Sequence, residues 1–260
     1  MKKQQKYILG GVLVLLAVIC AGVGISHFAR EKNAGKEYEE LKETVSAEPE
    51  AEEPEEELPE EEPEPKVEIP IDFAALKEQN EDVYAWIRIP GTNVDYPILQ
   101  HDEDNGYYLN HTIDGVEAIE GSIYTENYNS KEFDDPNTVI YGHNMKNGSM
   151  FRTLHNYEDR TFFDENRDIF IYMPDRILEY RIFAAYVYDN RHLLLNYDLE
   201  DPAVFQQYID DIFNIRAMNA YIDASMNVGA DDRILTLSTC NAGIETQRYL
   251  VQAVLISINY

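Results

Sequence analysis

The chain has 260 residues, of which 44% are hydrophobic and 12% aromatic, and its formal net charge is −28. This length and apolar content are enough for one good core. The acidic balance, with no cluster of lysine and arginine, argues against a nucleic-acid-binding protein. The composition also changes sharply along the chain, which predicts three segments: residues 1–30, 31–68 and 69–260.

Residues 1–30 have the features of a membrane anchor. Three lysines among the first six residues precede an apolar run from Tyr7 to Phe28, and about twenty apolar residues suffice to cross a ~30 Å hydrocarbon core as a helix. The positive-inside rule places the lysines in the cytoplasm and everything after Arg30 outside it. The alternative is a cleaved signal peptide, but such peptides have a shorter apolar region. We therefore expect a single-pass membrane protein with an extracytoplasmic C-terminal domain.

Residues 31–68 are almost wholly polar and include the run EPEAEEPEEELPEEEPEPK. The segment holds 17 acidic and 4 basic residues, a net charge of −13. It cannot bury enough apolar surface to offset its ordering entropy, and its like charges and prolines keep it extended. We expect a disordered stalk, while a tail that binds cations or a basic partner is the alternative.

Residues 69–260 are expected to fold as a mainly β domain. A short helix is predicted within residues 71–86, with Asp72 as its cap and Phe73, Leu76 and Val83 on one face. Eight segments rich in β-branched and aromatic residues, separated by turn residues, then predict eight strands. They are residues 86–92, 94–99, 121–126, 137–143, 169–174, 178–189, 233–239 and 248–258. Eight short strands indicate a closed or nearly closed barrel.

Helical patterns interrupt these strands at residues 147–159 and, more strongly, at residues 201–217. In the second pattern Pro202 stands at a helix start, and apolar residues recur at a spacing of three to four. These residues are Val204, Phe205, Tyr208, Ile209, Ile212 and Phe213. This helix lies in a long connection between the sixth and seventh predicted strands, and long connections are often functional.

The chain has two cysteines, Cys20 and Cys240. Cys20 follows AVI, and Ile19 stands where a lipoprotein acylation site needs a small residue, so we expect Cys20 to be a membrane-buried apolar side chain. With Cys20 in the bilayer, no intramolecular disulfide is available to Cys240. A lone cysteine is usually an inert core residue. Cys240, however, ends the predicted strand RILTLST, and an unpaired thiol outside the cell is open to oxidation.

His143 stands at the end of the predicted strand NTVIYGH, and the adjacent Gly142 would allow a close backbone approach. Two strand ends can meet at one rim of a barrel, which would bring His143 to Cys240. The other histidines of the domain are expected in loops or at helix flanks: His101, His111, His155 and His192. No pair of them has the spacing of metal ligands, so no metal site is expected.

Arg248 opens the last predicted strand, eight residues after Cys240. A loop that short brings this cation back beside the preceding strand end. Taken alone, such an arginine would be an ordinary surface residue, but near Cys240 it could stabilise an oxyanion. A cysteine, a histidine and an arginine together suit thiol acyl transfer as nucleophile, general acid and electrostatic stabiliser.

These motifs resemble those of the sortases, the transpeptidases of Gram-positive cell surfaces. The resemblance rests on LSTC followed by RY eight residues after the cysteine, with YGHN about a hundred residues earlier. WIRIPGTNVDYPILQ followed by DNGYYLNH is similar to the opening of the class B branch. The resemblance covers residues 69–260 and implies an eight-stranded sortase-type barrel with one helix between strands six and seven.

The resemblance also implies a mechanism and partners. Cys240 would attack the carbonyl of a threonine in a C-terminal sorting motif of a surface protein and form a thioester. His143 would protonate the departing amine and later deprotonate the incoming one, while Arg248 would hold the substrate backbone and the oxyanion. The amine would come from a peptidoglycan precursor or from another surface protein such as a pilin. No cofactor is implied.

By the same resemblance, five residues would line the groove for the sorting peptide: Asn105, Leu109, Ser238, Tyr208 and Ile209. Asn241 stands where the class B branch often has an acidic residue. This difference leaves a role of that position in substrate contact open.

Three other interpretations fit part of this pattern. A cell-surface cysteine protease would use the same thiol and imidazole but pass the acyl group to water; in the papain order, however, the histidine follows the cysteine, whereas His143 precedes Cys240. A non-catalytic surface-binding protein on a stalk would need Cys240 only as a structural residue. An L,D-transpeptidase would have a histidine shortly before its cysteine, and TLSTC has none.

Overall fold

The computed structural model describes residues 67–241 and 243–260. The expected membrane anchor, with Cys20, and the acidic stalk up to residue 66 lie outside the described residues. Within the described part, no helix has both the length and the apolar character needed to span a bilayer. The expected anchor therefore stays a prediction from the sequence.

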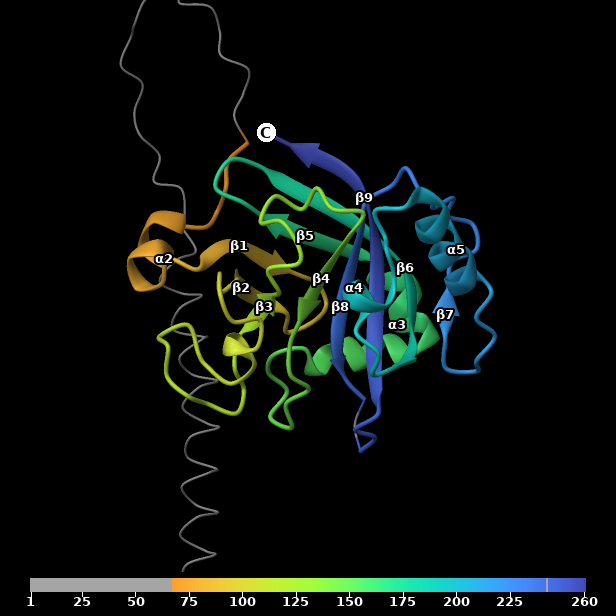
Figure 1. Ribbon diagram of the computed structural model, residues 1–260, viewed down its shortest axis with the longest axis horizontal. Helices are drawn as coiled ribbons and strands as arrows, with labels where there is room; N and C mark the ends of the chain where they lie inside the picture. Colours follow the sequence, from red (N-terminus) through yellow and green to blue (C-terminus); the bar gives the residue numbers. More distant parts are fainter. Residues whose placement is uncertain (1–66, 242) are drawn as a thin grey trace, which may run out of the picture.

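The domain is built mostly from strands, with short helices between them (Figure 1). In chain order its elements are α2 (Phe73–Gln79), β1 (Val83–Arg88), β2 (Asp95–Leu99), the 3₁₀-helix η1 (Tyr107–Leu109), β3 (Ile123–Thr125), β4 (Asn137–Tyr141), the 3₁₀-helix η2 (Arg152–Glu158), α3 (Arg160–Glu165), β5 (Asp168–Tyr172), β6 (Ile177–Asp189), α4 (Leu193–Asn196), α5 (Pro202–Phe213), β7 (Tyr221–Ile222), β8 (Ile234–Cys240) and β9 (Gln247–Asn259).

Eight strands form a closed barrel, as the sequence predicted. Their order is β5-β1-β2-β3-β4-β8-β9-β6, and pairing of β6 with β5 closes the ring. The two-residue strand β7, which the sequence did not predict, pairs only with β6. The β2–β3 and β4–β8 pairs are parallel, and the other pairs are antiparallel.

The two longest strands, β6 and β9, have 13 residues each and pair along their whole length. Their register shifts twice, between Glu179 and Tyr180 and between Ile182 and Ala184. Such bulges bend a strand and increase its twist, which lets a long pair follow the curved barrel wall. The end of β8 and the segment after β4 both lie in the lower part of Figure 1, and Asn144 of that segment donates to the Cys240 carbonyl at 2.9 Å.

Two hydrophobic clusters support the barrel. The larger one fills the barrel interior and includes Trp86, Leu99 and Leu237, all with no exposed surface. The smaller one lies where α5 packs on the barrel wall, and it includes Phe205 and Ile209 of α5. The strands therefore pack side chains into the barrel interior, and α5 covers part of the outer surface of the barrel.

The predicted helices form with some differences in extent. Asp72 caps α2 by accepting a hydrogen bond from the Ala75 N–H at 2.9 Å. The helix ends at Gln79, however, and Val83 opens β1 rather than sharing the helix face. The pattern at 147–159 forms η2, and α3 follows it. The pattern at 201–217 forms α5 with Pro202 in its first turn, although the same connection also holds α4 and β7.

A chain of buried hydrogen bonds ties α5 to the barrel wall. The Gln252 carboxamide, which has no exposed surface, donates to the Tyr208 hydroxyl at 2.7 Å and to Thr236 Oγ1 at 2.9 Å. Its Oε1 accepts from the Tyr186 hydroxyl at 2.9 Å. Thr236 in turn donates to Asn137 Oδ1 at 2.8 Å. One side chain therefore satisfies polar groups from α5, β6 and β8.

Gln252→Leu should lower the free energy of unfolding by about 1–3 kcal/mol, because it removes the buried acceptor of the Tyr186 hydroxyl and the buried donor to the Tyr208 hydroxyl. Urea denaturation of the purified domain measures this. The matched control is Gln207→Leu on the exposed face of α5, which should change stability by no more than about 0.5 kcal/mol. Equal effects of the two substitutions would contradict the structural role of Gln252.

Candidate active site

The β4–β8 pair places two of the predicted site residues at one rim. The strands pair in parallel from Asn137 with Ile234 to Tyr141 with Ser238, so their carboxyl ends lie at the same edge of the barrel. The Gly142 N–H donates to the Ser238 carbonyl at 3.2 Å and extends the pairing by one step. His143 and Cys240 follow directly at this edge.

Gly142 makes the close approach that the sequence suggested. A Cβ atom at this position would lie 2.5 Å from Ile123 Cδ1 and 2.7 Å from the Phe151 ring, which is closer than real side chains allow. The backbone of the next residue is also held, because the Phe151 N–H donates to the His143 carbonyl at 2.9 Å. The absence of a side chain at Gly142 therefore lets His143 lie against the barrel wall.

Arg248 reaches the same rim through the β8–β9 hairpin. The two strands are antiparallel, and Cys240 pairs with Arg248. Arg248 Nη1 donates to the carbonyls of Glu245 at 3.1 Å and Gln247 at 3.0 Å. These bonds hold the guanidinium against the turn that joins the strands. The short loop therefore returns the cation beside the cysteine, as expected.

Cys240 is a free, exposed thiol at the edge of a concavity of about 230 Å³. His143 and Arg248 line the same concavity, together with an apolar and aromatic wall. That wall consists mainly of Leu109, Tyr124, Tyr141, Tyr188, Leu193 and Leu250. A second concavity of about 750 Å³ shares Cys240 and Arg248 with the first and also contains Lys146 and Arg152. The thiol thus borders one largely apolar and one basic hollow.

The imidazole of His143 is tied to the loop before β3. Its Nε2 lies 2.6 Å from the Leu109 carbonyl oxygen. A carbonyl only accepts, so in this arrangement the proton sits on Nε2. The contact fixes the imidazole against the residue that forms one wall of the smaller concavity.

Two stacked tyrosines belong to the aromatic wall of the smaller concavity. The rings of Tyr124 and Tyr141 lie 5.4 Å apart. Burial raises the pKa of both hydroxyls well above the ordinary value, and the charge of Glu126 raises them further, while Arg248 acts in the opposite direction. Both side chains are therefore neutral at physiological pH, and they add no negative charge beside the thiol.

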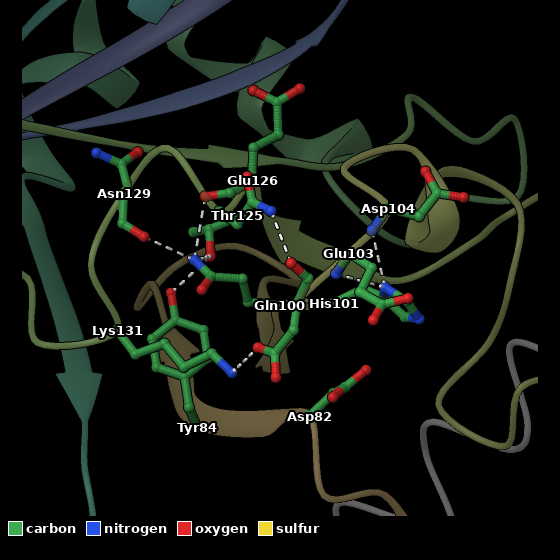
Figure 2. Close-up of polar contacts among 12 residues, drawn as sticks. Asp82, Tyr84, Gln100, His101, Glu103, Asp104, Thr125, Glu126, Asn129 and Lys131 are labelled. Carbon is green, nitrogen blue, oxygen red and sulfur yellow. Dashed lines mark hydrogen bonds and ion pairs between the residues drawn. The ribbon is translucent and has the colours of Figure 1, made fainter.

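Of the residues expected in the peptide groove, Leu109 and Ser238 line the smaller concavity, whereas Asn105 is not part of its lining. Asn105 Oδ1 instead accepts a hydrogen bond from the Asn127 N–H at 2.6 Å. In the same loop, His101 Nδ1 accepts from the Asp104 N–H at 3.0 Å (Figure 2). Asn105 therefore helps to hold the loop that carries Leu109.

A buried glutamine anchors this loop to the barrel (Figure 2). Gln100, which directly follows β2, is 4% exposed. Its Nε2 lies within 3.0 Å of three acceptors: Thr125 Oγ1, the Glu126 carbonyl and the Asn129 carbonyl. Nearby, Lys131 forms an ion pair with Asp102 at 2.9 Å. The segments before and after β3 are thus fixed to each other, which gives the wall of the concavity a rigid support.

Tyr208 and Ile209, expected in the peptide groove, lie elsewhere. They are 3% and 0% exposed, respectively, in the cluster between α5 and the barrel wall, and neither lines the smaller concavity. The apolar face of α5 is turned toward the barrel, so these side chains stabilise the fold. The structure corrects this part of the expectation.

Residues 190–193, at the start of the β6–α5 connection, take the place expected for the helix. Asn190, Arg191, His192 and Leu193 all line the smaller concavity. His192 Nε2 lies 2.6 Å from Glu126 Oε2. The sequence showed that NRHL follows the sixth strand, but the pairing of β6 with β9 that brings it to Arg248 was not visible there.

His155 also has a special setting that the sequence did not indicate. Its Nε2 lies 3.1 Å from the Cys240 carbonyl oxygen, although 85 residues separate the two.

Asn241, at the position where the class B branch often has an acidic residue, donates from its carboxamide to Gln247 Oε1 at 2.8 Å. Among residues 67–241 and 243–260, no group of three His, Cys, Asp or Glu side chains is arranged to hold a metal ion.

Comparisons with known proteins agree with this arrangement. The sortase domain profile matches residues 87–256. Sortase B of Listeria monocytogenes is 35% identical over 184 residues, which cover 70% of this chain and 73% of that protein. Sortase B from B. anthracis in complex with AAEK1 superposes with a TM-score of 0.72 at 26% identity, over 88% of this chain and 99% of that one.

A Staphylococcus aureus sortase B–substrate complex superposes with a TM-score of 0.63 at 30% identity, over 71% of this chain and 84% of that one. The matched region contains the barrel rim with Cys240, His143 and Arg248. The sequence profile, the relatives and the solved structures lead to the same conclusion: this chain belongs to the sortase family, in the branch of the sortase B enzymes.

Proposed function

We propose that Cys240, His143 and Arg248 carry out the reaction of this sortase, which is a cysteine transpeptidase that anchors surface proteins to the cell wall. The observation that carries the proposal is that these three side chains line one concavity at the end of three neighbouring strands. Their side chains supply a nucleophile, a proton donor and a fixed positive charge.

In the first half-reaction His143 takes the proton of the Cys240 thiol. The thiolate attacks the threonine carbonyl of the sorting motif, and the C–S bond forms as the carbonyl oxygen becomes an oxyanion. Arg248 donates hydrogen bonds to this oxyanion. The intermediate collapses when the C–N bond breaks, and His143 gives a proton to the leaving amine. The products are a thioester on Cys240 and the released C-terminal fragment.

In the second half-reaction an amine attacks the thioester carbonyl. His143 accepts the proton that the amine loses, and the C–S bond breaks to return the thiolate of Cys240. The amine belongs to a peptidoglycan precursor or to another surface protein. The larger concavity suits this step, because Lys146, Arg152 and Arg248 outnumber the single carboxylate of Glu245 in its lining. A net positive charge nearby disfavours the unreactive ammonium form of the amine.

The smaller concavity holds the reacting end of the sorting motif. Its volume of about 230 Å³ lies below the ~300 Å³ at which small-molecule sites usually begin, so it accommodates only a part of the peptide. Leu109 and Leu193 offer apolar contacts, while Ser238 and the neutral hydroxyls of Tyr124 and Tyr141 can hydrogen-bond to the peptide. The remaining motif residues lie along the surface outside the concavity.

The proposal includes the location of the enzyme. The lysines at the N-terminus and the apolar run up to Phe28 support a membrane anchor with its N-terminus in the cytoplasm. The acidic segment 31–68 then acts as a spacer. The catalytic domain stands outside the membrane, where sorting signals and peptidoglycan precursors are accessible.

Intact-mass spectrometry tests the first half-reaction. A soluble form of residues 66–260 is mixed with peptides of the NPxTx and xPxTG kinds, and the wild type should gain the mass of the N-terminal peptide fragment as a thioester. Cys240→Ala should gain none, although circular dichroism should show the same fold. A mass gain that survives Cys240→Ala would contradict Cys240 as the nucleophile, and it would place the acyl group on another residue.

Arg248→Ala should lower peptide turnover about a hundredfold or more, because a lost oxyanion donor costs about 3–4 kcal/mol in the transition state. Steady-state kinetics with the peptide identified above measures the effect. Arg248→Lys should recover only part of the activity, since an ammonium group cannot reproduce the planar set of N–H donors of the guanidinium. As a control, Arg160→Ala, which removes an exposed ion pair on α3, should leave turnover close to that of the wild type. Near-normal turnover of Arg248→Ala would remove this residue from the mechanism.

A further inference from the structure

The side chain of Asn144 continues the β4–β8 pairing after the backbone of β4 has turned away. The last backbone contact is the bond from Gly142 N–H to the Ser238 carbonyl, at 3.2 Å. Asn144 and Cys240 each lie two residues further along their strand direction, and there Asn144 Nδ2 donates to the Cys240 carbonyl at 2.9 Å. His143 lies between these two anchored residues. The carboxamide thus connects the segment that carries the imidazole to the residue that carries the thiol.

His155 determines how this carboxamide is turned. Its ring is only 7% exposed and stacks on Tyr249 at a centroid distance of 4.9 Å. Its Nδ1 lies 2.6 Å from Glu158 Oε1, and its Nε2 lies 2.9 Å from Asn144 Nδ2. Because a carboxylate accepts, Nδ1 carries a proton, and in the neutral ring Nε2 then accepts from Asn144.

This assignment uses both N–H groups of Asn144, one toward His155 Nε2 and one toward the Cys240 carbonyl. The opposite orientation would place the Asn144 carboxamide oxygen next to His155 Nε2 and the Cys240 carbonyl oxygen, which are both acceptors. The Cys240 carbonyl lies 3.1 Å from Nε2, but two acceptors cannot bond to each other, so the ring acts on this carbonyl through Asn144.

We propose that Glu158, His155 and Asn144 form a positioning relay that holds the Cys240 peptide group, and with it the thiol, in register with His143. Glu158 orients the ring, the ring orients the carboxamide, and the carboxamide fixes the Cys240 carbonyl. The three residues act through Cys240 and His143, so they are positioning residues. A relay is needed here because Cys240 is the exposed last residue of β8, and a misplacement of about 1 Å in reacting groups can cost about a hundredfold in rate.

The first test measures kcat and KM for a sorting peptide with the full chain. Asn144→Ala and the isosteric Asn144→Asp should each lower kcat about 10- to 100-fold, with KM within about twofold of the wild type, because the defect lies in the geometry of the reacting groups. The matched control is Asn156→Ala, an exposed asparagine on η2, which should not change kcat. A loss in KM alone, or unchanged kinetics in both Asn144 variants, would overturn the relay.

Two variants of His155 separate positioning from packing. Phenylalanine keeps a ring over Tyr249 but removes the acceptor, whereas glutamine loses the ring and keeps an oxygen close to the position of Nε2. The relay predicts that His155→Gln retains more activity than His155→Phe, and a packing role predicts the reverse order. The double variant Asn144→Ala with His155→Phe should be no slower than Asn144→Ala, since His155 acts through Asn144. Additive losses would contradict the relay.

A measurement that needs no substrate keeps this test separate from the proposed reaction. In the wild type, the side-chain amide protons of Asn144 should exchange slowly with water in ¹⁵N-edited NMR spectra, and this protection should vanish in His155→Phe and persist in His155→Gln. Fast exchange in the wild type would overturn the relay. Protection in a protein that forms no thioester with any peptide would instead contradict the proposed reaction and leave the hydrogen-bonded relay standing.

Discussion

The site depends on the parallel pairing of β4 with β8. Because this register places Tyr141 opposite Ser238, the residues after both positions leave the sheet at the same edge. A slip of one residue would turn every side chain of one strand to the other face, and His143 would no longer meet Cys240. Closure of the barrel removes free strand edges in the catalytic wall, which helps to keep this register fixed.

The antiparallel β8–β9 hairpin adds the third group by purely local means. Only the turn between Cys240 and Arg248 separates them, so the cation follows the cysteine wherever β8 places it. Long-range pairing thus sets the distance between thiol and imidazole, and a short turn sets the distance between thiol and guanidinium. The loops that surround the rim supply the remaining contacts, while the strands below provide a rigid base.

Much of this arrangement was readable in the sequence, because it depends on local patterns. Cys240, His143 and Arg248 each stand at the end or the start of an apolar strand pattern, and Asp72 and Pro202 mark helix starts that the structure confirms. The resemblance to sortases added the roles of these residues. The number of barrel strands also followed from the spacing of β-rich segments.

The rest required contacts between distant parts of the chain. The periodicity of α5 showed an apolar face, but only its packing on the barrel shows that Tyr208 and Ile209 are buried there. His155 and His192 stand in segments without a distinctive pattern, and they reach the site through contacts with Cys240 and Glu126 that no single sequence reveals. The end of α2 before Val83 was missed because the helical spacing continues into β1.

In the proposed reaction, the thiol of Cys240 forms an acyl-enzyme that an amine resolves. The most direct measurement is the rate at which the isolated thioester on Cys240 disappears as the concentration of an added amine increases, followed by intact mass. We expect the rate to rise with amine concentration and the product to have the mass of the peptide–amine conjugate. A rate that does not depend on the amine, with the free peptide acid as the product, would contradict the proposed reaction and identify a hydrolase.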